Sequence, residues 1–132
     1  MSDEQYDKAK DFISLQAWQA ARETKLYFYR NILPALDPPE KYNLGTQIRR
    51  AAISITANIA EGHGRFNYQE SIQFCRISRG SLFELKDHLL SCHDLGYASD
   101  ELFQKGLELI ENTKRLLNGY IRFLHKEKRA KN

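Results

Sequence analysis

The sequence has few of the residues that build turns and membrane spans. Its 132 residues include only three prolines and seven glycines, which is too few for the frequent tight turns of an all-β fold. No uncharged apolar run reaches the length that spans a bilayer, and this excludes a transmembrane protein. The acidic, polar start of the chain differs from the basic start of a secretory signal. Length and composition therefore predict one globular domain.

Cysteine is also scarce. Cys75 and Cys92 are the only two, and both fall within one predicted helix. A rise of about 1.5 Å per residue separates them by about 25 Å, which is too far for a disulfide bond. Two unpaired thiols are typical of a reducing compartment, so we expect a cytoplasmic protein.

The common catalytic motifs are missing as well. The chain contains no Walker-type phosphate loop, no G-x-S-x-G and no H-E-x-x-H. His88 and Cys92 share one predicted helix face, but a zinc site needs a third and usually a fourth protein ligand, and nothing in the sequence places one there. We expect a protein that is not an enzyme and has no catalytic residues, metal site or cofactor.

Helical periodicity is present almost throughout. Apolar residues recur at steps of three and four in segments 11–33, 43–61, 67–95 and 99–125. Four amphipathic helices joined by short loops predict an all-α, antiparallel up-down-up-down four-helix bundle. We assign the bundle to residues 11–125, between a flexible N-terminus at 1–10 and a basic C-terminal tail at 126–132.

Polar residues and glycines mark the expected helix ends. Pro34 is expected to end the first helix and to begin an irregular loop, and Gly80 inside the third helix indicates close approach of another backbone. N-caps are predicted at Asn43, Asn67 and Ser99, and C-terminal turns at residues 62–64 and at Gly96.

The second predicted helix is apolar on two sides. Ile48 and Ile55 lie on one face, whereas Ile53 and Ala57 lie on the opposite one. A helix with two apolar faces needs two partners, and in a small protein one of them lies outside the chain. We therefore predict a homo-oligomer, with an interface formed by Thr46, Ile53, Ala57, Ala60, Ile72, Phe83 and Leu90.

Basic charge is concentrated late in the sequence. The net charge of +3 arises from 20 basic and 17 acidic residues. Residues 1–62 are balanced, and residues 126–131 hold four basic residues against one acidic residue. A basic end attracts polyanions, but a solvated chain end explains the same residues equally well.

Arginines gather around the predicted junction of the second and third helices. Guanidinium groups bind phosphates bidentately and stack on bases. Glu61, Glu70 and Glu84 lie in the same stretch and can neutralise these arginines as ion pairs at a subunit interface, so both interpretations stay open. The candidate nucleic-acid-binding residues are Arg49, Arg50, Arg65, Arg76, Arg79, Lys126, Lys128, Arg129 and Lys131.

Three segments carry a resemblance to a known family. QIRRAAISI at residues 47–55, NIAEG at 58–62 and GSLFEL at 80–85 resemble the bacterial four helix bundle proteins, also called the 23S rRNA intervening-sequence proteins. The likeness covers roughly residues 12–123. It implies a bundle that assembles as a ring-like homopentamer. It also implies kinship with the accessory variability determinant of diversity-generating retroelements, a basic pentamer that binds nucleic acid and a reverse transcriptase.

Two functions are compatible with these features. The first is a non-enzymatic, homo-oligomeric protein that associates with RNA or DNA through phosphate contacts and does not read sequence. The second is a homopentameric scaffold that docks a protein partner such as a reverse transcriptase and does not itself bind nucleic acid. Neither function requires a membrane.

Overall fold

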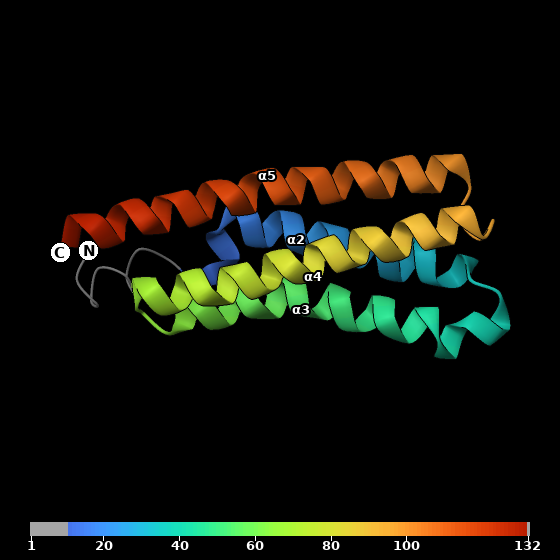
Figure 1. Cartoon of the computed structure of the whole chain (residues 1–132), viewed down its shortest axis with the longest axis horizontal. Coiled ribbons are helices and arrows are strands. Elements are labelled where there is room, and N and C mark those ends of the chain that lie inside the picture. Colours follow the sequence, from blue (N-terminus) through green and yellow to red (C-terminus); the bar gives the residue numbers. More distant parts are fainter. Residues whose placement is uncertain (1–10, 132) are drawn as a thin grey trace.

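The chain folds into four antiparallel α-helices (Figure 1). The computed structural model describes residues 11–131, and none of these residues forms a strand. The all-α four-helix bundle predicted from the sequence is confirmed, while the expected flexible N-terminus at 1–10 lies outside the described residues. In chain order the elements are η1 (Phe12–Ser14), α2 (Gln16–Tyr27), η2 (Phe28–Ile32), η3 (Leu33–Ala35), η4 (Pro38–Tyr42), α3 (Leu44–Gly64), α4 (Tyr68–Asp94) and α5 (Asp100–Lys131).

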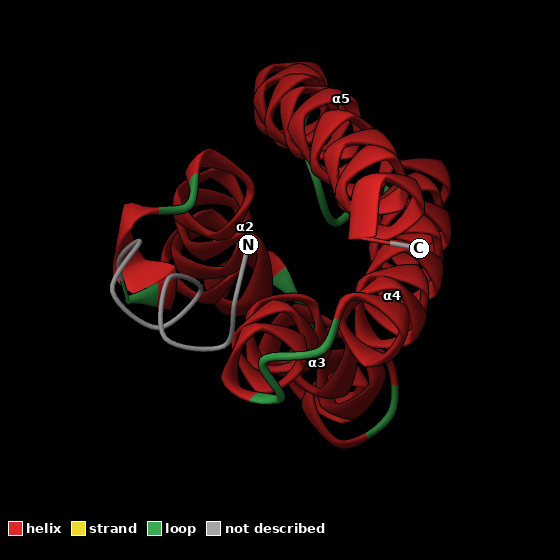
Figure 2. Cartoon of the chain, turned by 90° about the vertical axis from the view of Figure 1, so that its left-hand side faces the viewer, coloured by secondary structure: helices red, strands yellow, loops and turns green. Residues whose placement is uncertain are grey.

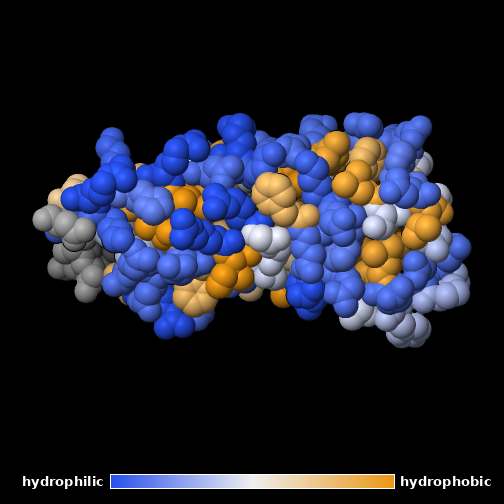
Figure 3. Space-filling view, viewed as in Figure 1, coloured by the Kyte–Doolittle hydropathy of each residue, from blue (hydrophilic) through white to orange (hydrophobic). Residues whose placement is uncertain are grey.

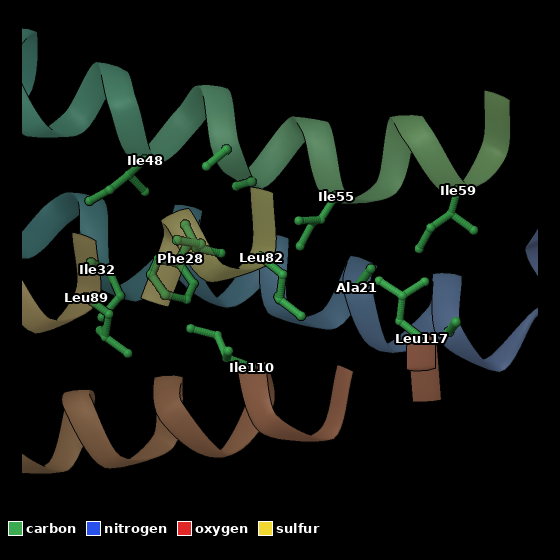
Figure 4. Packing of buried hydrophobic residues seen from close by; sticks show 14 of the residues in the cluster. Ala21, Phe28, Ile32, Ile48, Ile55, Ile59, Leu82, Leu89, Ile110 and Leu117 are labelled. Carbon is green, nitrogen blue, oxygen red and sulfur yellow. The ribbon is translucent and has the colours of Figure 1, made fainter. Parts of the chain in front are cut away.

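All four helices contribute to a single core (Figures 2 and 4). Seen along the bundle, α2, α3, α4 and α5 follow one another around it. Each large apolar side chain that the core buries stabilises the fold by about 1.5–3 kcal/mol. Those that are fully buried are Phe28, Ile32, Ile48, Ile55, Ile59, Ile72, Leu82, Leu85, Leu89, Ile110, Leu117 and Leu124, and Figure 4 shows Phe28, Ile55 and Leu117 among them. Among the described residues, no helix is long and apolar enough to cross a membrane.

Two of the three N-caps that the sequence predicts form in the structure. Asn67 accepts a hydrogen bond from the Glu70 amide at 2.9 Å, and Ser99 accepts one from the Leu102 amide at 3.1 Å. Gly96 has φ +81°, as expected for a left-handed turn after a helix. Asn43 occupies the N-cap position of α3, but its side chain forms no cap and instead donates to Glu40 Oε1 at 3.0 Å.

The prolines do not produce the irregular loop that we expected. Pro34 lies inside the 3-10 helix η3, which continues from the π-helix η2 without a break. Pro38 and Pro39 begin the 3-10 helix η4. At the first positions of a helical turn the missing proline N–H has no bond to make, so these prolines start helical turns.

Gly62 lies where α3 and α4 approach each other closely. This corrects two expectations, the C-terminal turn at residues 62–64 and the close approach at Gly80. Gly62 lies within α3, and a Cβ there would lie 2.9 Å from Phe74 Cβ and 3.2 Å from Ser71 Cα of α4. The positive φ after α3 belongs to Phe66, at +53°. Gly80 is exposed, and a Cβ at this position would have no neighbouring atom within 4 Å. Within the described chain, the backbone approach is therefore at Gly62 and not at Gly80.

Gly62→Ala is expected to lower the free energy of unfolding by about 1–3 kcal/mol, because the added methyl forces α3 and α4 apart. Gly64→Ala is the matched control two residues later, since a Cβ at Gly64 has no neighbour within 4 Å. Urea denaturation of both variants measures the difference. An equal loss in the two variants would show that close helix packing is not the reason for glycine at position 62.

Helix α5 extends further than the sequence interpretation allowed. The residues assigned to a basic tail continue the helix to Lys131, because long unbranched side chains favour helix and cations suit its C-terminal end. The Lys128 ammonium bonds to Gln69 at the start of α4. Helix α5 thus reaches the level of Ile72, which is 1% exposed and packs in the core.

Ile72 was therefore wrongly assigned to a subunit interface, since it is buried within its own chain. The other expected interface positions have different surroundings. Ile53 and Phe83 are each 51% exposed and Leu90 is 41% exposed. Thr46 and Ala57 are also exposed, and Ala60 is half-buried.

Candidate nucleic-acid interface

Helix α5 separates its charges along its length. From Asp100 to Glu111 it carries four acidic residues and one basic residue, whereas from Asn112 to Lys131 it carries seven basic residues and one acidic residue. Leu117 and Leu124 of the basic half pack into the core. This packing turns much of the positive charge toward the outside.

Three arginines recur at intervals of seven residues in this half. Arg115, Arg122 and Arg129 are exposed, and two helical turns, or about 10 Å, separate each from the next. We call them the arginine row. Arg115 donates to the Asn112 side chain at 2.7 Å. Within residues 11–131, no ion pair joins the row to a carboxylate.

Helix α4 adds to the same surface. Arg79 donates to Asn118 Oδ1 of α5 at 2.9 Å, and Arg76, one turn earlier, is exposed. Strongly hydrophilic residues, with apolar ones between them, are frequent on the half of the surface where α5 terminates (Figure 3). We call this surface the basic face, and it comprises Arg76, Arg79, Arg115, Arg122, Lys126, Lys128, Arg129 and Lys131.

Two lysines nearby are already neutralised. Lys114 and Lys86 place their ammonium groups 2.6 Å and 2.9 Å from the Glu111 carboxylate. The hydrogen bonds from these two ammonium groups lower the pKa of Glu111, and the bond from Lys114 has the larger effect. Because this carboxylate stays charged, both lysines are occupied, and we leave them out of the basic face.

The three remaining candidate arginines lie elsewhere and have partners. Arg50 pairs with Glu84 at 2.6 Å, and Arg65 pairs with Glu61 at 2.9 Å. Arg49 donates to the Lys41 carbonyl at 2.8 Å. The pairs with Glu84 and Glu61 form within one chain.

These arginines also do not form one cluster at the α3–α4 junction. Arg50 and Arg65 are 15 residues apart on and just after α3, which corresponds to about 22 Å of helix. Exposed pairs of this kind stabilise the fold by less than about 1 kcal/mol. However, a carboxylate beside each guanidinium competes with any phosphate, so we exclude Arg50 and Arg65 from the basic face.

Sequence reasoning overlooked Arg115 and Arg122. The signal for them was present in two forms: the seven-residue repeat that they make with Arg129, and the change from acidic to basic composition at residue 112. A charge total for a whole half of the chain shows neither signal. It does not record spacing, and the acidic start of α5 cancels part of its basic end in the sum.

The thiols of Cys75 and Cys92 are unreactive near neutral pH. Cys75 and Cys92 are both buried and free. Burial raises the pKa of Cys75 to about 12 and that of Cys92 to about 11. Since the thiolate is the nucleophile and the metal ligand, both side chains stay protonated and serve as core residues.

A comparison with known protein families identifies a match. A family model described as 23S rRNA-intervening sequence protein matches residues 14–119. The matched range covers α2, α3, α4 and the start of the basic half of α5, and it ends before Arg122. No curated protein matches the chain.

Proposed function

The chain belongs to the 23S rRNA-intervening sequence protein family, and we propose that it is a non-enzymatic, homo-oligomeric protein that associates with RNA. The basic face would contact phosphates and would not read the base sequence. One observation carries this proposal: the basic half of α5 presents an arginine row that no carboxylate of the described chain neutralises.

The chemistry of the basic face supports phosphate binding. Guanidinium groups match phosphate oxygens in a bidentate geometry. The row extends over about 20 Å of helix, so it can meet several phosphates of one strand or duplex. Since every nucleotide offers the same phosphate, contacts of this kind supply affinity without sequence preference.

Binding of the protein to a structured RNA is expected to weaken steeply with salt. For four phosphate contacts, the affinity falls by about 100-fold when the salt concentration rises from about 50 to 200 mM, because each contact releases condensed counterions. A filter-binding titration at several salt concentrations measures this slope. Absence of binding at low salt, or binding that salt does not change, contradicts the proposal.

Self-association is the second part of the proposal. Ile53 of α3 and Ile77, Phe83 and Leu90 of α4 are large, exposed apolar side chains, and contact with other copies removes such surface from water. We propose the ring-like homopentamer that the family resemblance implies. Assembly would gather several basic faces in one particle and raise its avidity for RNA.

A scaffold that docks a protein is the alternative, and the same apolar side chains favour it. The implied kinship with the accessory variability determinant makes a reverse transcriptase the partner to consider. The salt titration separates the two functions, because a pure scaffold has no affinity for RNA at any salt concentration. Two unpaired thiols support a reducing, cytoplasmic setting in either case.

A further inference from the structure

A groove of about 390 Å³ lies beside the arginine row, between the first turn of α2 and the basic half of α5. Arg115 and Arg122 belong to its lining, and a Cβ at Gly119 would lie 3.7 Å from the Arg122 guanidinium. The missing side chain at Gly119 thus leaves space on α5, and Arg122 reaches across it. The volume falls in the range of small-molecule binding sites.

An aromatic pair adjoins the same stretch of α5. Tyr120 lines the groove, and its ring lies nearly parallel to that of Phe123, at 15° with the centroids 6.2 Å apart. Phe123 is 46% exposed, although it is surrounded in sequence by Arg122 and Lys126. Flat rings among cations are the combination with which proteins hold unpaired bases and the phosphates that link them.

We propose that this groove binds single-stranded nucleic acid, with phosphates on Arg115 and Arg122 and a base against the Tyr120–Phe123 pair. The inference rests on the proposed function and adds a preference for single strands. In a duplex the faces of the bases are stacked on one another, whereas an unpaired base offers its face to an aromatic ring. Only a single strand therefore uses both the cations and the rings.

Fluorescence anisotropy of the full chain tests the preference. The probes are a labelled unstructured RNA strand and the duplex that this strand forms with its complement, both at low salt. The wild type is expected to bind the single strand more tightly. Phe123→Leu is expected to weaken single-strand binding by about fivefold or more, and to leave duplex binding and the thermal midpoint unchanged.

Tyr42→Leu is the matched control. Tyr42 is 89% exposed and lies at the end of η4, beside the start of α3 and away from the end where α5 terminates. This substitution is expected to change neither affinity.

The remaining outcomes overturn the inference in distinguishable ways. If Phe123→Leu changes neither affinity, or lowers both equally, the aromatic pair does not select single strands, while salt-dependent binding by the wild type still supports the proposed function. If Phe123→Leu changes the sedimentation coefficient and not the RNA affinity, the pair belongs to a contact between copies. If the wild type binds neither probe, the inference and the proposed function fail together.

Discussion

Replacing Arg115, Arg122 and Arg129 together by glutamate is expected to weaken RNA binding by at least about 100-fold at low salt. The change removes three phosphate contacts and places three negative charges against the backbone of the RNA. The slope of log affinity against log salt is expected to become shallower by nearly three, since each contact contributes about 0.9 to it for a duplex. A filter-binding titration of the variant measures both effects.

The triple variant is expected to fold. All three arginines are exposed, and the side chains that α5 buries are untouched. Glutamate in place of Arg129 near the C-terminal end of α5 costs about 0.3–1 kcal/mol through the helix dipole. Circular dichroism before each titration separates this small loss from unfolding.

A second triple variant controls for net charge. Arg30, Lys41 and Lys105 are exposed and lie outside the basic half of α5. Their replacement by glutamate changes the net charge by the same amount. Because these side chains are away from the basic face, we expect the control to lose only a small part of the affinity. Equal losses in the two variants would show that overall charge, and not the arginine row, determines binding.

Ile53→Glu is expected to convert the proposed homo-oligomer into soluble single chains. Ile53 is 51% exposed on α3, so the substitution leaves the core of each chain intact. Within an interface between copies, however, the new carboxylate would have to be desolvated without a partner, and such a cost exceeds what a small apolar contact returns. Sedimentation velocity distinguishes a chain of 15.4 kDa from its oligomers.

Leu95→Glu is the control for Ile53→Glu. Leu95 follows α4 and is 58% exposed, and it lies outside the apolar surface assigned to self-association. We expect this variant to sediment like the wild type. If Ile53→Glu remains oligomeric, the interface lies elsewhere on the surface, and if the wild type itself sediments as a single chain, the proposed homo-oligomer is wrong.

The fold was predictable because its signals are local. Helical periodicity and the caps at Asn67 and Ser99 act over one or two turns, so the sequence places them directly. The errors concern contacts between helices. Gly62 looks like a helix end until α4 is placed against it. Ile72 looks like a surface residue until the packed helices show it in the core. No short-range pattern carries this information.

The candidate site was predictable in part. Arg76, Arg79 and the basic end of α5 were among the predicted binding residues, and the structure places Arg79 against Asn118 of α5. Arg50 and Arg65 were named beside them because they are close in sequence. Whether a guanidinium is available depends on which carboxylate lies opposite, as Glu84 does for Arg50, and this is a property of packed helices.

The uneven charge of α5 also bears on the proposed association with RNA. Helix α5 runs along most of the bundle (Figure 1), with Asp100 and Glu101 near one end and Arg129 and Lys131 at the other. The side chains of α5 therefore give the described bundle opposite charges at the two ends of this helix, which act as an electric dipole. In the field of a polyanion such a dipole rotates before contact. The C-terminal end of α5 then faces the polyanion at first contact. A larger fraction of collisions therefore has the orientation that binding requires.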